Sequence, residues 1–209
     1  MSRDYLQLNV QVMQLLGGLE DLKIEDNVDA LISEKRKTMR DLLISQDVSS
    51  SVLDMLFYRE VMVEKDLDDA AVLELFVNQD ESSVAKRYAN MMLDFYGIEY
   101  YLRKNEKPNL KHVGNIPQFD FDNAKDVKQL AFKSPYFRTM KDIKLEDYRK
   151  KMDETLFESF KPDANKPIGL DGIVGKVIVY NLLLDNLRIK NKAIYLNVDE
   201  EKIVRDFHA

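Results

Sequence analysis

Apolar side chains in this sequence recur three or four positions apart in one segment after another. Between positions 27 and 44 this spacing places them along a single stripe, which is the pattern of a helix that buries one face. The stripe consists of Val28, Leu31, Ile32, Met39, Leu42 and Leu43. The same spacing returns over 3–16, 51–63, 66–76, 83–97 and 144–160. The sequence therefore predicts a mainly α fold.

The size and composition of the chain exclude several classes of protein. With 209 residues, of which 45% are apolar, the chain can bury a core without metals or disulfides. It contains no cysteine, which excludes a disulfide scaffold, thiolate metal sites and a cysteine nucleophile. The N-terminus lacks the pattern of a secretory signal, and the apolar stretch 173–184 is too short to span a bilayer. We expect a cytoplasmic protein without membrane contact.

Glycine and proline positions indicate how the chain is divided. Residues 1–97 are predicted to form a helical bundle-like region that ends at Gly97. The next segment, 98–117, is predicted to be a linker or loop, because 104–117 is polar and contains Pro108, Gly114 and Pro117. Its first residues, 98–102, could instead extend the preceding helix or form a short strand. Residues 118–209 are predicted to form a second helical region. The sequence leaves open whether this region shares one core with residues 1–97.

The C-terminal region contains the most ambiguous patterns. From 171 to 184 the chain is apolar on most sides, which favours a buried helix, although its β-branched residues also suit a buried strand. Residues 187–198 alternate around a polar centre in a way that allows a small β-hairpin. The acidic residues from Asp199 onward are typical of the first turn of a short terminal helix.

Charge is distributed unevenly along the chain. Residues 1–100 carry a net charge of −10, whereas residues 101–209 carry +4. The positive charge is concentrated in 100–151, where basic side chains alternate with aromatic ones, as in grooves that bind single-stranded nucleic acid. The other interpretation, in which the aromatic residues belong to a core that the lysines surround, is favoured because the chain as a whole is acidic. The candidate contacts to an anionic partner are Arg103, Lys104, Lys107, Lys111, Lys125, Lys128, Lys133, Tyr136, Arg138 and Lys141.

Motifs for catalysis or cofactor binding are incomplete. The glycines at 169, 172 and 175 before Lys176 do not have phosphate-loop spacing, and no Ser or Thr follows the lysine. Their spacing of three instead suits a helix that approaches a neighbouring backbone closely. The two histidines, His112 and His208, belong to no recognisable catalytic or metal-binding set. We expect no cofactor and no metal.

The leading functional hypothesis is a non-enzymatic helical protein that acts through protein–protein contacts as an adaptor, regulator or assembly factor. It rests on the succession of amphipathic helices, the lack of a catalytic set and the nine methionines, which adapt well to partner surfaces. Its candidate partner surface consists of Met91, Met92, Phe95 and Tyr96, and the partner is another protein or a second copy of the chain. The alternative hypothesis is a nucleic-acid-binding protein that uses 100–151.

Overall fold

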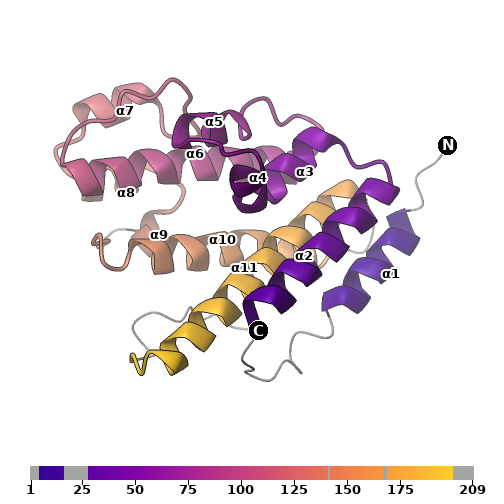
Figure 1. The fold of residues 1–209 in the computed structure, drawn as a ribbon. Helices are drawn as coiled ribbons and strands as arrows, with labels where there is room; N and C mark the ends of the chain where they lie inside the picture. Colours follow the sequence, from indigo (N-terminus) through magenta and orange to yellow (C-terminus); the bar gives the residue numbers. More distant parts are fainter. Residues whose placement is uncertain (1–4, 17–27, 141, 167–168, 200–209) are drawn as a thin grey trace.

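The computed structural model describes residues 5–16, 28–140, 142–166 and 169–199 (Figure 1). Within these ranges the chain forms eleven helices and no strand. The helices are α1 (Tyr5–Leu16), α2 (Val28–Ser45), α3 (Ser50–Leu56), α4 (Tyr58–Glu64), α5 (Asp69–Glu74), α6 (Ser83–Lys104), α7 (Gln118–Asn123), α8 (Val127–Lys133), α9 (Phe137–Met140), α10 (Tyr148–Ala164) and α11 (Leu170–Tyr195). The predicted mainly α fold is confirmed.

The longest helix, α11, passes through the centre of the molecule. It packs against α10 along much of its length and also contacts α1, α2, α3 and α6 (Figure 1). Neighbours on several sides explain why its first half is apolar nearly all round. The predicted hairpin over 187–198 is wrong, because α11 continues as a helix to Tyr195 and no strand follows among the described residues. The predicted terminal helix lies almost entirely outside the described residues.

The second long helix, α6, runs beyond the predicted boundary at Gly97. It ends at Lys104, where Asn105 adopts the left-handed conformation with φ of 53°. Gly97 does not end the helix; it makes room for Phe121 of α7, whose ring would lie 2.6 Å from a Cβ at this position. The predicted loop 98–117 is therefore helical up to Lys104 and irregular only from Asn105 onward.

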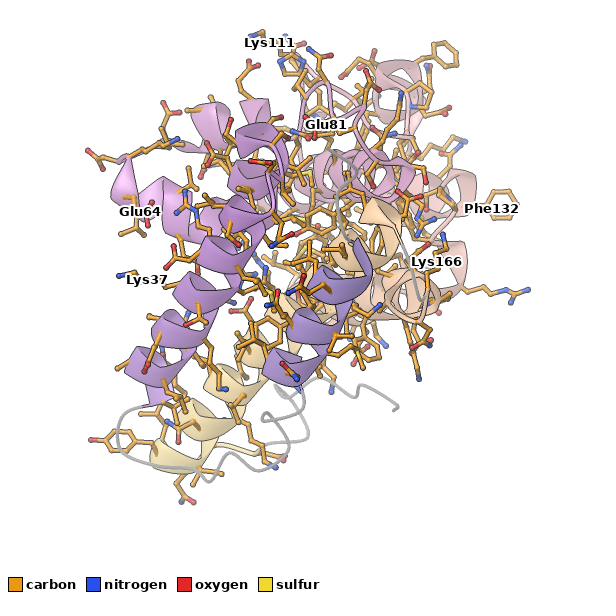
Figure 2. The ribbon with its side chains drawn as sticks, turned by 90° about the vertical axis from the view of Figure 1, so that its right-hand side faces the viewer. Lys37, Glu64, Glu81, Lys111, Phe132 and Lys166 are labelled. Atoms are coloured by element: carbon orange, nitrogen blue, oxygen red, sulfur yellow. The ribbon has the colours of Figure 1, made fainter. Side chains whose placement is uncertain are left out.

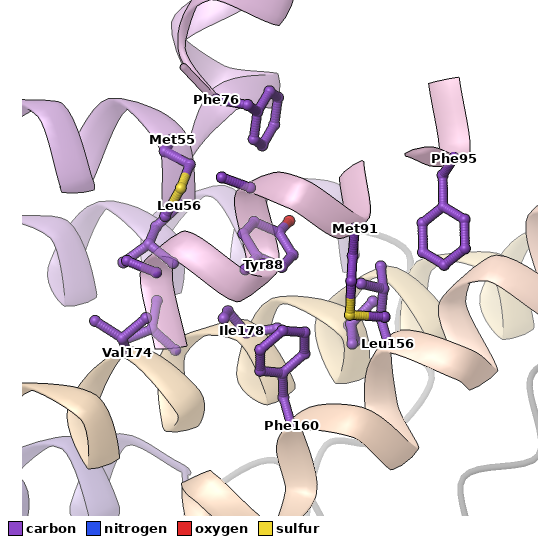
Figure 3. Close-up of a cluster of buried hydrophobic side chains, with 14 of the residues drawn as sticks. Met55, Leu56, Phe76, Tyr88, Met91, Phe95, Leu156, Phe160, Val174 and Ile178 are labelled. Carbon is purple, nitrogen blue, oxygen red and sulfur yellow. The ribbon is translucent and has the colours of Figure 1, made fainter. Parts of the chain in front are cut away.

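The buried apolar side chains form one continuous cluster that includes residues from both halves of the sequence. Its centre is visible in Figure 3, where Tyr88 of α6 lies between Phe76 and Phe160. The ring centroids of Tyr88 and Phe160 are 5.7 Å apart in an edge-on arrangement. Met91, on the same helix, points toward Leu156 of α10.

Side chains cap several helices. Ser49, Asp68, Ser82 and Asp126 each accept a hydrogen bond from a backbone N–H in the first turn of the helix that follows. The predicted helix over 51–63 is interrupted at Phe57, which separates α3 from α4. This break turns the short helix α4 toward α2, a position that matters for the candidate site.

The loop between α6 and α7 is fixed by a buried carboxylate. Asp94 is fully buried and accepts hydrogen bonds from Ile116 N–H (2.8 Å), the Asn115 side chain (2.9 Å) and the Tyr136 hydroxyl (2.7 Å). Gly114 lies so close to α6 that a Cβ would be 1.9 Å from the carbonyl oxygen of Asn90. The loop is therefore held tightly against α6.

Gly172 and Gly175 of α11 have the structural role that their spacing suggests, whereas Gly169 precedes the helix with φ of 99° and a Cβ there would have no neighbour within 4 Å. A Cβ on Gly172 would lie 2.8 Å from the Lys166 carbonyl oxygen, and one on Gly175 would lie 2.8 Å from the Ala164 nitrogen. The buried ammonium of Lys176 donates a hydrogen bond to the Lys166 carbonyl at 2.9 Å. These residues bring the start of α11 against the end of α10.

Candidate functional site

A groove of about 1000 Å³ opens between α2, α4, α5, α6, α10 and α11. Its size is at the upper end of the range for small-molecule pockets in proteins. Side chains from helices far apart in sequence form it, and its floor is largely aromatic and apolar. The floor includes Phe57, Phe76, Met92, Phe95 and Met152.

One side of the groove is a continuous stripe on α2. The lining residues of this helix are Ser33, Arg36, Lys37, Arg40, Asp41 and Ile44. If the adjacent residues 36 and 37, and likewise 40 and 41, are taken as pairs, successive positions are three or four residues apart. All six residues therefore share one face of the helix. At a rise of 1.5 Å per residue, the stripe is about 16 Å long.

Ion pairs join α2 to α4 and α11 beside the groove. Arg36 is 3% exposed and pairs with Glu60 at 2.7 Å and with Asp185 at 2.8 Å. Asp185 also pairs with Arg59, so one carboxylate of α11 holds two guanidinium groups. Further along α2, Arg40 pairs with Glu64 at 3.0 Å. The position of α4 relative to α2 is therefore set by charged contacts as much as by packing.

A second, much smaller cavity of about 30 Å³ shares several lining residues with the groove, including Arg36, Tyr58 and Met92. Within the described part of the chain, Arg36 Nε and Asn181 Oδ1 have no hydrogen-bond partner. A buried polar atom without a hydrogen-bond partner lowers the stability of the folded protein unless solvent or a ligand supplies that partner. The smaller cavity, which both residues line, thus offers both a donor and an acceptor.

Exposed apolar residues lie at the outer edge of the groove. Val63 is 77% exposed, Ile44 53% and Met62 36%, and all three belong to the groove lining. An exposed apolar edge beside an aromatic floor is typical of surfaces that another molecule covers. Figure 2 shows Lys37 and Glu64 on this side of the molecule.

The predicted partner surface is divided by the structure. Met92, Phe95 and Tyr96 line the groove, whereas Met91 is 2% exposed and packs in the core (Figure 3). The groove also contains Arg36 and Arg59, which the sequence analysis did not select, and their partner Asp185 lines the smaller cavity. Arg36 had a recognisable signal, because it occupies a core-facing position between Ile32 and Met39 in an otherwise apolar stripe. A buried arginine in such a stripe requires charged partners from elsewhere in the fold.

The predicted basic segment lies on a different part of the surface. In Figure 2, Phe132 of α8 is on the opposite side from Lys37 and Glu64. Of the selected cations, those with described side chains are exposed: Arg103, Lys104, Lys107, Lys111, Lys125, Lys128 and Arg138. The side chain of Lys133 and all of Lys141 lie outside the described residues.

Many of these cations already contact acidic or polar groups of the protein. Arg103 pairs with Glu99 at 2.7 Å, Lys111 with Glu74 at 2.5 Å and Lys128 with Asp142 at 3.7 Å, while Lys107 donates to a backbone carbonyl. Lys104, Lys125 and Arg138 have no ion pair within the described ranges. Tyr136 is 5% exposed and bonded to Asp94, so its ring is not available for stacking.

Metal-binding groups are not brought together in the part of the chain that the structure describes. No cluster of three histidine or carboxylate side chains suited to a metal occurs there. His112 contacts Glu74 at 3.0 Å, beside Lys111 on the same carboxylate. Hydrogen bonds from Lys111 and His112 lower the pKa of Glu74 below its ordinary value.

Comparisons with known proteins give no further constraint on the site. No protein-family model, no curated protein sequence and no solved structure matches this chain. Within the described ranges, no helix combines the length and apolarity that crossing a membrane requires. The functional argument therefore rests on the groove itself.

Proposed function

We propose that this protein is a non-enzymatic interaction protein that binds a helical segment of a partner protein in the groove. The observation that carries the proposal is the continuity between the aromatic floor and the exposed apolar edge formed by Ile44, Met62 and Val63. Protein interfaces typically combine an apolar centre with a polar rim, and the groove has both.

The dimensions of the groove suit a helix. Its α2 side is about 16 Å long, which corresponds to about three helical turns of a partner. A helix bound in this way would place side chains at i, i+3, i+4 and i+7 on the aromatic floor. Candidate residues from the sequence, Met92, Phe95 and Tyr96, lie in this groove.

The ion pairs that join α2 to α4 support the proposal in a second way. Binding costs less free energy when the binding surface is already ordered before the partner arrives. Arg36 and Arg40 hold Glu60 and Glu64 of α4 in place, so the two sides of the groove are positioned in the free protein.

Affinity capture with matched variants tests this function. The wild-type protein, Val63→Glu and Leu145→Glu serve as baits in lysate from the source cells, and captured proteins are then purified for direct titration. Leu145 is a suitable control because it is 46% exposed and lies outside the groove lining. A charge placed in an apolar contact is expected to weaken partner binding by at least about tenfold.

We expect the purified partner to bind wild-type protein and Leu145→Glu alike and to lose affinity for Val63→Glu. Light scattering of the three proteins shows whether the partner is a second copy of the chain, in which case Val63→Glu dissociates the oligomer. Equal partner affinity for all three baits would contradict binding in the groove.

Binding of single-stranded nucleic acid by 100–151 is a second candidate function. It is favoured by Phe119 and Phe132, whose side chains are 70% and 69% exposed in a region that also contains Lys104 and Lys125, two cations without an ion pair among the described residues. Exposed aromatic rings can stack on bases while lysines contact phosphates. A titration with a labelled oligonucleotide at 50 and 200 mM salt tests it. Absence of binding at the lower concentration would rule it out.

A further inference from the structure

Methionine side chains line the groove from three helices. Met62 belongs to α4, Met92 to α6 and Met152 to α10. A methionine side chain is unbranched and polarizable, so it packs well against apolar groups of different shapes. Proteins that bind several different partners commonly do so through methionine-rich surfaces that can repack. The three methionines therefore allow the apolar surface of the groove to adjust to the molecule that it binds.

Two of these methionines have space on more than one side. Met92 and Met152 line both the groove and the smaller cavity of about 30 Å³. In a close-packed interior, neighbouring atoms restrict each side chain to a single position. A cavity beside the side chain removes part of this restriction. When a larger group presses on the floor of the groove, the thioether of Met92 or Met152 can move toward the cavity.

The charged residues of the groove are largely compensated by the protein itself. Five of the six cations in its lining pair with carboxylates of this chain, namely Arg36, Arg40, Arg59, Arg149 and Arg188. The sixth, Lys37, has no ion pair within the described ranges, and neither do the lining residues Asp41 and Asp69. These three side chains are exposed and of mixed sign. Because salt and solvent screen such charges, they contribute little to the choice of a partner.

We propose that the groove recognises the apolar face of a helix with low sequence specificity, so that stripes of leucine, methionine or phenylalanine bind alike. This inference rests on the proposed function, because it specifies the partner of the same groove. The partner class is amphipathic helices with large apolar side chains along one face, whatever the charges beside that face. A groove of this kind binds several different helices rather than one.

Four fluorescein-labelled 14-residue helical peptides test this specificity. They share the same mixture of Glu and Lys outside the stripe, and their stripe positions hold Leu, Met, Phe or Ala. Fluorescence anisotropy gives the dissociation constant of each peptide at 50 and 300 mM salt. We expect the Leu, Met and Phe peptides to bind within about fivefold of one another. The Ala peptide should bind at least about tenfold more weakly than any of them, because it buries much less apolar area.

The salt series tests the minor role of charge. The dissociation constants of the Leu, Met and Phe peptides should change by less than about threefold between the two salt concentrations, since the ion pairs of the groove are formed within the protein. A larger loss of affinity at 300 mM would show that charges of the groove contribute to the choice of partner, and would overturn the inference.

A stiffer floor should make the groove selective. Met92→Ile replaces the flexible side chain with one of similar size that is branched at Cβ and has few rotamers. We expect the spread among the Leu, Met and Phe peptides to widen beyond about fivefold in this variant. Met13→Ile makes the same change at a methionine of α1 that is 51% exposed and lies outside the groove lining, and it should leave the spread unchanged. Equal spreads in the two variants would overturn the role of the methionine.

The remaining outcomes separate this inference from the proposed function. A preference of more than about fivefold for one apolar stripe in the wild-type protein, or equal binding of the Ala peptide, would overturn low specificity for large apolar side chains and leave groove binding intact. Val63→Glu should weaken binding of the Leu, Met and Phe peptides by at least about tenfold. Unchanged binding to Val63→Glu would place the peptides elsewhere and overturn the proposed function as well. If none of these three peptides binds the wild-type protein, both are overturned.

Discussion

The guanidinium of Arg36 lies 2.8 Å from the carboxylate of Asp185, and both side chains are almost completely shielded from solvent, at 3% and 9% exposed. This ion pair connects α2, which forms one side of the groove, to the central helix α11. Asp185 also neutralises Arg59, so a single carboxylate compensates two guanidinium groups. Asp185 therefore links α2 and Arg59 to the central helix α11.

Asp185→Ala should therefore destabilise the protein strongly. Removing one partner of a buried pair leaves the other charge uncompensated, which typically costs about 3–5 kcal/mol in the free energy of unfolding. Urea denaturation followed by circular dichroism measures this loss. Asp80→Ala removes an exposed pair with Lys86 and should change the free energy by less than about 1 kcal/mol. Similar losses in the two variants would contradict the assigned role of Asp185.

Gly175→Ala should separate the start of α11 from the end of α10. The new Cβ would lie 2.8 Å from both the Ala164 nitrogen and the Asp163 Cβ, so the backbone must shift. Overpacking of this kind typically costs about 1–3 kcal/mol. Thermal unfolding should show a lower Tm for Gly175→Ala than for Lys190→Ala, a change on the exposed surface of the same helix. An unchanged Tm for the glycine variant would show that α10 and α11 are not in close contact.

The contribution of Asp94 should make stability depend on pH. Burial raises the pKa of this carboxyl above its ordinary value of 3.8, despite the hydrogen bonds that it accepts. Because the folded protein holds the proton more tightly, the contribution of Asp94 is fully present below pH 3.8 and is lost as pH rises through the raised pKa. The difference in unfolding free energy between wild type and Asp94→Asn should therefore fall as pH increases from 3.5 to 7 in a series of urea titrations. A difference that grows with pH would contradict this assignment.

Local sequence patterns predicted the helices because their causes are local. The apolar stripe of 27–44 corresponds to α2, and serine or aspartate caps mark the starts of α3, α5 and α6. The errors arose where a distant element decides the outcome. Gly97 resembles a helix end in sequence, yet Phe121 packs over it and the helix continues. The alternation in 187–198 resembles a hairpin, yet α11 continues to Tyr195.

Most of the groove could not be predicted from the sequence, because contacts between distant elements form it as well. Its lining comes from helices that are separated by long stretches of sequence, and no local pattern shows that Phe57, Phe95 and Met152 share one surface. The exception is Arg36, whose place in the core-facing stripe of α2 indicates a buried charge. Sequence alone does not reveal that its partners are Glu60 and Asp185.

Hydrogen exchange of the protein with and without its captured partner tests the central claim most directly. Binding in the groove should slow amide exchange in 33–44 and 58–64, which form its α2 and α4 sides, and leave 118–133 unchanged. Slower exchange confined to 118–133, with 33–44 and 58–64 unaffected, would contradict the account and place the interaction on α7 and α8.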